Sequence, residues 1–179
     1  MYAIISELDS ESSLIVSGLW LKLRRSCGLS AIYEIPTPHF SWLVAESLDV
    51  DKAAPILSQI ADQASVMTLH TFGLGIFSGK KPVLYLPLVK TRDMIALHEM
   101  IWDQIHPYAK DEKLYYSPKL WVPHITLALN DLTKESLSCA INAIAYESVE
   151  LFVKVDNLAI AEHQEDRTGK IRSQFRFLD

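Results

Sequence analysis

Apolar residues recur every three or four positions in four segments, and this spacing predicts four amphipathic helices. Gly28, a residue typical of helix C-caps, follows the first segment, and Thr133 is the expected N-cap of the last. Pro107 closes the third segment, because proline cannot continue a helix. The four helices are expected over residues 10–27, 51–65, 91–106 and 133–146.

Shorter segments alternate apolar and polar residues or form short apolar runs, and these patterns predict β-strands. The segment "IRSQFRFL" near the end of the chain alternates regularly, as is typical of a half-exposed strand. Turn-forming residues at 78–82 and 162–170 predict two hairpins, each between neighbouring strands. The strands are expected at 2–7, 39–46, 66–77, 83–89, 122–129, 149–161 and 171–178.

The order of these elements is similar in the two halves of the chain, 2–89 and 91–178. Each half has a helix, a strand that begins with Pro-His, a second helix and two hairpin strands. This order predicts two related, pseudo-symmetric lobes with a cleft between them. Because no Gly-, Pro- or Ser-rich linker separates the halves, residues 1–179 are expected to form a single bilobal domain.

Composition and charge narrow the class of protein. Hydrophobic residues make up 49% of the 179 residues, which is typical of a globular chain and excludes a disordered one. The net charge of −5 argues against a long nucleic acid as partner, since such proteins usually present a basic face. Cys27 and Cys139 have no metal-site spacing, so reduced thiols in a cytoplasmic protein are expected. Neither a signal peptide nor a membrane-spanning run is visible.

The Pro-His strands carry the candidate chemistry. Side chains two positions apart on a strand point to the same face. His39 therefore shares a face with Ser41, and His124 shares a face with Thr126, whereas the apolar neighbours point the opposite way. One such motif is typical of a structural strand, but two copies at matching places in the two halves favour a functional pair. The motifs are "PHFSW" at 38–42 and "PHITL" at 123–127.

Two imidazoles facing one cleft suit the opening of a cyclic phosphodiester. Imidazole titrates near pH ~6.5, so one histidine can be neutral and the other protonated near neutrality. The neutral ring accepts a proton from the attacking water or hydroxyl, and the protonated ring donates one to the leaving oxygen. Ser41 and Thr126 would donate hydrogen bonds to the phosphoryl oxygens. This scheme requires neither a metal nor another cofactor, and it leaves open which histidine is the base.

On these motifs and this element order, the chain resembles the two-histidine phosphoesterase superfamily, which includes 2′-5′ RNA ligase-like proteins and 2′,3′-cyclic nucleotide phosphodiesterases. The resemblance implies an α+β fold of two lobes, with antiparallel sheets around a central cleft and helices packed outside. It implies that His39 and His124 are the catalytic acid–base pair and that Ser41 and Thr126 bind phosphate. The chain departs from many RNA ligase-like members in having Leu129 near the place of a basic residue.

Other polar and aromatic residues are expected to be structural or remain open. His70 and His98 are expected to be buried or hydrogen-bonded, and His106 to lie at a helix end. His163 lies in a turn with the acidic residues Glu162, Glu165 and Asp166, where a solvated turn is the expected structure and a metal site the alternative. Base stacking and strand packing are both open for the aromatic residues before the second motif, Tyr115, Tyr116 and Trp121. Lys80 and Lys81 are expected in a turn. Lys119 is expected to be solvated, with a phosphate contact as the alternative.

The sequence thus predicts a metal-independent phosphoesterase, a hydrolase in RNA processing that acts on a 2′,3′-cyclic phosphate or a 2′-5′ linkage. The expected partner is a small nucleotide or a short RNA end, and the expected state is a cytoplasmic monomer without membrane contact. One alternative is a module that binds a nucleotide or phosphorylated metabolite in the same cleft without turnover. Another is a metallohydrolase that uses His39 and His124, although the motifs do not supply a third ligand.

Overall fold

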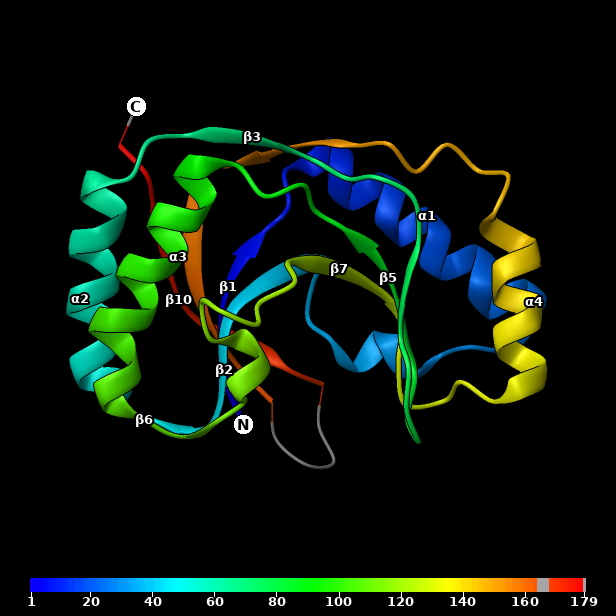
Figure 1. The fold of residues 1–179 in the computed structure, drawn as a ribbon, viewed down its shortest axis with the longest axis horizontal. Coiled ribbons are helices and arrows are strands. Elements are labelled where there is room, and N and C mark those ends of the chain that lie inside the picture. Colours follow the sequence, from blue (N-terminus) through cyan, green and yellow to red (C-terminus); the bar gives the residue numbers. More distant parts are fainter. Residues whose placement is uncertain (164–167, 179) are drawn as a thin grey trace.

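The protein is known as a computed structural model that describes residues 1–163 and 168–178. Its fold is α+β, as predicted, and all strand pairs in the described residues are antiparallel. Figure 1 shows a strongly curved set of strands with two helices at each end.

The four predicted helices are confirmed, with bounds within a few residues of those expected. Gly28 ends the first helix in a left-handed conformation at φ 72°, which costs glycine nothing. The Thr133 side chain accepts a hydrogen bond from the backbone N–H of Ser136, so it is the N-cap of the last helix. The helices are α1 (Ser10–Cys27), α2 (Val50–Gln63), α3 (Arg92–Ile105) and α4 (Lys134–Ile144).

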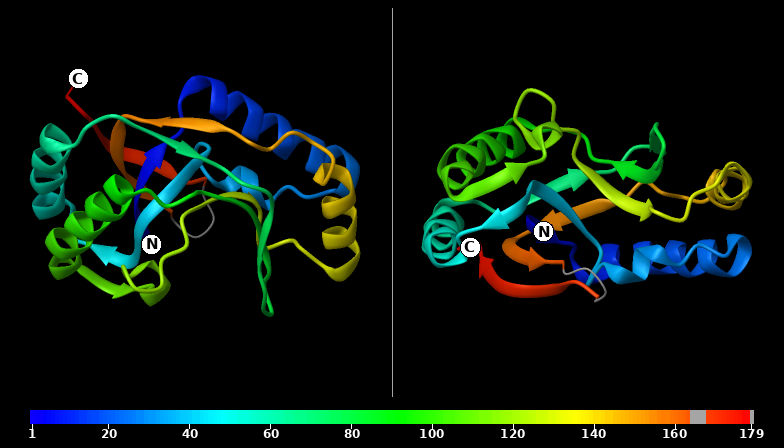
Figure 2. Two further views of the ribbon diagram at one scale, coloured as in Figure 1. Left: turned by 45° about the horizontal axis from the view of Figure 1, so that its top comes forward. Right: turned by 90° about the horizontal axis from the view of Figure 1, so that it is seen from below.

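The helices pack as two pairs, α1 with α4 and α2 with α3, on opposite sides of the strands (Figures 1 and 2). A disulfide joins Cys27 at the end of α1 to Cys139 in α4. The expectation of reduced thiols is therefore wrong. The two cysteines are 112 residues apart in sequence, and only the packing of α1 on α4 brings them together. Among the described residues, no helix is both long and apolar enough to cross a membrane.

Eight strands form one sheet in the order β10-β9-β1-β2-β7-β5-β4, and β6 pairs with the outer part of β2. The predicted hairpin around 78–82 is confirmed, because β4 pairs with β5. The last two strands of the sheet, β9 and β10, also pair, although part of the turn predicted at 162–170 lies outside the described residues. The strands are β1 (Tyr2–Glu7), β2 (His39–Leu48), β4 (Gly75–Phe77), β5 (Val83–Pro87), β6 (Ala109–Glu112), β7 (His124–Ala128), β9 (Asn157–Glu162) and β10 (Lys170–Arg176).

Two of the predicted strands are each divided in the structure. The segment 66–77 contains β3 (Met67–His70) and β4, and the segment 149–161 contains β8 (Phe152–Val155) and β9. β3 pairs with β8 in a separate two-stranded sheet, so the chain leaves the small sheet and enters the large one within each segment. Gly73, at φ 70°, lies in the first of these breaks.

The large sheet consists of two strand groups that meet at a single residue pair. The first group is β10, β9, β1 and β2 with β6, and the second is β7, β5 and β4. Each group takes strands from both sequence halves, since β9 and β10 pair beside β1 whereas β4 and β5 pair beside β7. The repeat of 2–89 in 91–178, and two lobes built from it, stay predictions.

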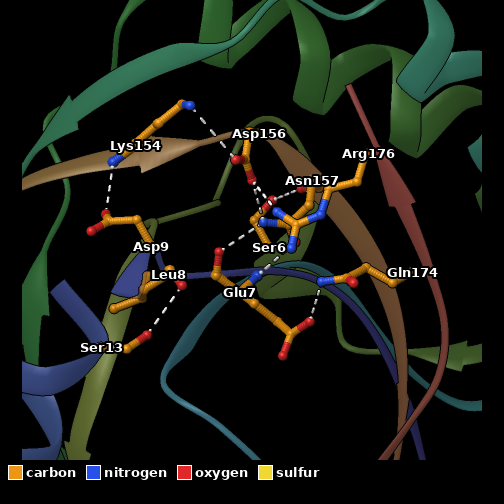
Figure 3. Close-up of polar contacts among 10 residues, drawn as sticks. All are labelled: Ser6, Glu7, Leu8, Asp9, Ser13, Lys154, Asp156, Asn157, Gln174 and Arg176. Carbon is orange, nitrogen blue, oxygen red and sulfur yellow. Dashed lines mark hydrogen bonds and ion pairs between the residues drawn. The ribbon is translucent and has the colours of Figure 1, made fainter. Parts of the chain in front are cut away.

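A polar cluster fixes the end of β1 that lies beside the start of β2 (Figure 3). The Asn157 side chain accepts a hydrogen bond from the Glu7 N–H at 3.0 Å and donates one to the Glu7 carbonyl at 2.9 Å. The Ser6 hydroxyl donates to the Asn157 carbonyl at 2.6 Å. It also accepts a hydrogen bond from the buried indole of Trp42 at 2.9 Å. Because Glu7 is the register partner of His39, this cluster holds the strand next to the first motif.

Candidate active site

The first motif begins β2. His39 and Ser41 are partly accessible, whereas Phe40 and Trp42 are buried on the opposite face in the hydrophobic core. The alternation predicted from the sequence is therefore confirmed here. Because Phe40 and Trp42 are buried on the core face, strand alternation places the imidazole of His39 and the hydroxyl of Ser41 on the opposite face.

The second motif forms β7 in the same way. His124 and Thr126 are partly accessible, and Ile125 and Leu127 are fully buried. Tyr85 of β5 is the register partner of Thr126, so its ring stands on the same face. Its centroid lies 5.1 Å from that of His124.

The two motifs meet where the two strand groups join. The joining pair is Phe40 with Ile125, the residue that follows the histidine in each motif. A cavity of about 580 Å³ opens on the other face, and His39, Ser41, His124 and Thr126 all line it. The structure thus brings the four predicted site residues together, from strands that are far apart in sequence.

Both imidazoles are oriented by the same hydrogen bond. Nδ1 of His39 lies 2.8 Å from the carbonyl oxygen of Thr37, and Nδ1 of His124 lies 2.7 Å from that of Val122. A carbonyl oxygen can only accept, so Nδ1 carries the proton in each ring. Nε2 then holds the lone pair of the neutral imidazole and makes no hydrogen bond to the described residues. This nitrogen of each ring is available to a bound molecule.

Burial changes the charge state expected for the pair. Desolvation lowers the pKa of His39 to about 4, against the raising effect of the hydrogen bond to Thr37, and His124 adds a smaller lowering effect. Desolvation also lowers the pKa of His124. The sequence-based expectation of one neutral and one protonated ring near neutrality therefore changes. In the free protein both rings are neutral at pH 7, and a bound anion is needed to favour a proton on one of them.

Aromatic residues form much of the cavity wall. Tyr115 is exposed and Tyr116 is buried, and both line the cavity. Trp121 lies behind the wall instead, fully buried and stacked on His98 with a centroid distance of 3.7 Å. Packing is therefore the structural role of Trp121, whereas the two tyrosines face the space where a ligand would bind.

Two aromatic residues near His124 were not singled out from the sequence. Phe77 lines the cavity, and its ring meets that of His124 edge-on at 4.8 Å. The ring of Phe77 also stacks on that of Tyr85 at 4.1 Å. The hairpin register carried the only signal for this cluster, because β4 and β5 place both rings on the face of the second motif.

Charged side chains on the cavity wall are few. Lys81, expected as a solvated turn residue, lines the cavity, whereas Lys80 and Lys119 do not. Glu34 and Glu162 also line it, and the Glu162 carboxylate pairs with Arg172 at 2.5 Å. Leu129, in the place of the family's frequent basic residue, is another lining residue. The wall thus offers a phosphate mainly hydroxyl and imidazole groups.

Three of the remaining histidines lie away from the cavity. His98 is buried, and its Nε2 donates to the Trp42 carbonyl at 3.0 Å, as expected for a structural histidine. His70 stacks on Phe152, and His106 at the end of α3 lies 3.1 Å from Glu112.

His163 lines the cavity beside Glu162. Glu165 and Asp166, which suggested the alternative of a metal site, lie outside the described residues. Within residues 1–163 and 168–178, no group of three histidine, cysteine or carboxylate side chains is arranged to hold a metal ion.

The sequence model of the 2′-5′ RNA ligase superfamily matches residues 12–167, which include both motifs. The chain belongs to the 2′-5′ RNA ligase superfamily. This confirms the resemblance to two-histidine phosphoesterases, and family membership supports a phosphoesterase or RNA ligase-like function. A search of curated proteins gave no match.

Solved structures show the same fold. The protein TT0787 of Thermus thermophilus superposes with a TM-score of 0.67 at 14% identity, covering 98% of this chain and 97% of its own. A crystal structure described as a phosphoesterase has a TM-score of 0.59 at 14% identity, covering 99% and 98%. These likenesses show that the fold is shared over nearly the whole chain.

Proposed function

We propose that the protein is a metal-independent phosphoesterase that hydrolyses a 2′,3′-cyclic phosphate or a 2′-5′ phosphodiester of a nucleotide or short RNA. One observation carries the proposal: His39, Ser41, His124 and Thr126 all line a single cavity, and the backbone carbonyl at Nδ1 of each ring leaves Nε2 available to a bound molecule. Membership of the superfamily supports the same class of reaction.

The proposed reaction divides the proton transfers between the two rings. The neutral imidazole takes a proton from water as its oxygen bonds to phosphorus. The bond from phosphorus to the 2′ or 3′ oxygen breaks, and the protonated imidazole gives its proton to that oxygen. A phosphomonoester results. Ser41 and Thr126 donate hydrogen bonds to the non-bridging oxygens, where negative charge is held in the transition state. Either histidine can take either role.

The pKa values of the free protein are compatible with this division once substrate binds. A phosphodiester anion beside two neutral rings attracts a proton to one of them, since an opposite charge within a few ångströms raises a histidine pKa. The substrate thereby generates the catalytic acid. We propose a small substrate and a monomeric protein, as the sequence suggests. A cytoplasmic location stays a prediction, and the disulfide between Cys27 and Cys139, a bond rare in that compartment, argues against it.

Hydrolysis assays in excess chelator test the proposal. The substrates are the four 2′,3′-cyclic nucleotides and a 2′-5′-linked dinucleotide, with phosphomonoester release measured by chromatography. We expect turnover of at least one substrate at the same rate with and without chelator. Binding of nucleotides without turnover would instead establish the binding module, and activity restored only by added metal would establish a metallohydrolase.

A further inference from the structure

Two buried tryptophans hold the backbone of the two motifs at corresponding places. The indole N–H of Trp121 donates to the carbonyl of Ser41 at 3.0 Å, and that of Trp20 donates to the carbonyl of Thr126 at 3.0 Å. In each motif the accepting residue is the one that carries the hydroxyl. We propose that Trp121 and Trp20 are positioning residues, which fix the backbone from which the Ser41 and Thr126 hydroxyls reach the substrate's phosphoryl oxygens.

Ser41 and Thr126 lie where the two strand groups join, and the weak pairing there explains why the indole hydrogen bonds are needed. β2 and β7 pair only through Phe40 and Ile125, and the two strand groups separate on either side of this pair. Few ladder hydrogen bonds therefore fix Ser41 and Thr126 relative to each other. A carbonyl oxygen has two lone pairs, so it can accept an indole N–H in addition to any strand partner.

Both rings are held firmly enough to act in this way. Trp121 is 1% exposed, and its ring contacts those of His98, at a centroid distance of 3.7 Å, and Trp42, at 5.3 Å, in a cluster of three rings. Trp20 is 5% exposed in α1 and meets the ring of Tyr33 edge-on at 6.1 Å. Stacked and buried rings have little freedom to turn, so each N–H stays directed at its carbonyl.

The chemistry of the site makes such positioning valuable. A hydroxyl stabilises the transition state only when it points at the oxygen on which charge develops. A displacement of ~1 Å can reduce the rate ~10²-fold. The rings of His39 and His124 are fixed by separate hydrogen bonds, so loss of an indole N–H should affect the hydroxyls and leave the imidazoles in place.

The test replaces each indole by a ring without the N–H and measures kcat and KM for a cyclic nucleotide. We expect Trp121→Phe and Trp20→Phe each to lower kcat by ~10-fold or more, with KM nearly unchanged, as for an interaction made in the transition state. Trp102→Phe is the matched control. That indole makes no hydrogen bond to the described residues and stacks on His106 outside the cavity.

Double variants separate positioning from a general structural defect. In a Ser41→Ala background, Trp121→Phe should change kcat by less than ~2-fold, because the hydroxyl it positions is gone. In a Thr126→Val background, Trp121→Phe should keep its full effect. Trp20→Phe should have little effect in the Thr126→Val background and its full effect in the Ser41→Ala background. Equal losses in both backgrounds, or no loss in either single variant, would overturn the inference.

The inference rests on the proposed function. Calorimetric measurement of 3′-AMP binding distinguishes failure of the inference from failure of the proposed function. If the wild type turns over and binds the nucleotide while both tryptophan variants match Trp102→Phe, the inference fails and the proposed function stands. If the wild type turns over none of the four cyclic nucleotides or the 2′-5′-linked dinucleotide and does not bind 3′-AMP, the proposed function fails, and the positioning role falls with it.

Discussion

His39 and His124 both line the cavity, and one nitrogen of each ring is hydrogen-bonded to the local backbone. Nδ1 of His39 and of His124 both bond a carbonyl two residues earlier. Such a bond selects one tautomer and fixes the ring plane. The catalytic roles proposed for the two rings therefore depend on a local geometry that each Pro-His strand creates for itself.

The common face of His39 with Ser41, and of His124 with Thr126, could be predicted because strand alternation is local. Phe40 and Ile125 had to be buried, and their neighbours then had to share the other face. The pKa values could not be predicted in the same way. They depend on what the rest of the chain places around each ring, and burial lowers the pKa of His39 to about 4.

These shifts predict the pH dependence of catalysis. kcat/KM reports ionisation in the free protein, where burial places the pKa values of His39 and His124 below 6.5. We expect kcat/KM to rise as pH falls from about 8 and to be maximal below about pH 6.5, because a proton on one ring becomes more frequent. kcat should peak at higher pH, because the bound anion raises the pKa of the acid. A kcat/KM that increases steadily up to about pH 8 would contradict the assignment.

At the scale of elements, the second motif depends on the hairpin beside it. Tyr85 of β5 lies across from Thr126, and its ring packs over Gly75 of β4. A Cβ at position 75 would lie 2.3 Å from that ring, which no real contact allows. The absence of a side chain at Gly75 therefore permits the stack of Tyr85 on Phe77 and the tilted contact of Tyr85 with His124.

We expect Gly75→Ala to displace the Tyr85 ring, to lower the free energy of unfolding by about 1–3 kcal/mol and to reduce activity. Gly18→Ala is the matched control, since nothing lies within 4 Å of a Cβ at that position of α1. It should leave activity unchanged and stabilise the helix by about 0.5–1 kcal/mol. Urea unfolding and the cyclic nucleotide assay measure both effects. Equal behaviour of the two variants would contradict the packing described.

The disulfide between α1 and α4 makes a second prediction at this scale. Cys27 and Cys139 lie 112 residues apart, and closing so long a loop restricts the unfolded chain by about 4–5 kcal/mol in the entropy model. We expect Cys27→Ser/Cys139→Ser, or reduction, to lower the unfolding temperature. Labelling of the unfolded, unreduced protein should find no free thiol. Two reactive thiols before reduction would show that the bond does not form in solution.

Element boundaries could be predicted where local residues set them, and less well where contacts distant in sequence set them. Gly28 ends α1 and Thr133 caps the start of α4, both as expected, because capping residues are local signals. The divisions of segments 66–77 and 149–161 were missed, although Gly73 and Asp156 lie at the two breaks, because the surrounding residues are largely apolar and read as one continuous strand. The edge strand β6 was missed because its sequence, AKDE, is mostly charged.

At the scale of the whole molecule, the site is made by one contact between two strand groups. The pair of Phe40 and Ile125 brings together motifs that start at residues 38 and 123. The sequence predicted that the motifs would share a cleft but not which strands would surround it. Pairing between strands distant in sequence decides which strands surround the cleft. For example, β9 and β10, from the end of the chain, complete the strand group that holds the first motif.

The central claim is that both histidines act together on one phosphodiester. The most direct measurement compares kcat for the preferred cyclic nucleotide in the wild type, His39→Ala and His124→Ala, with folding checked by circular dichroism. His106→Ala, which removes an imidazole outside the cavity, is the control. We predict a loss of ~10²–10⁴-fold in each site variant and wild-type activity in the control. Activity within a few-fold of wild type in either His39→Ala or His124→Ala would contradict the two-histidine mechanism.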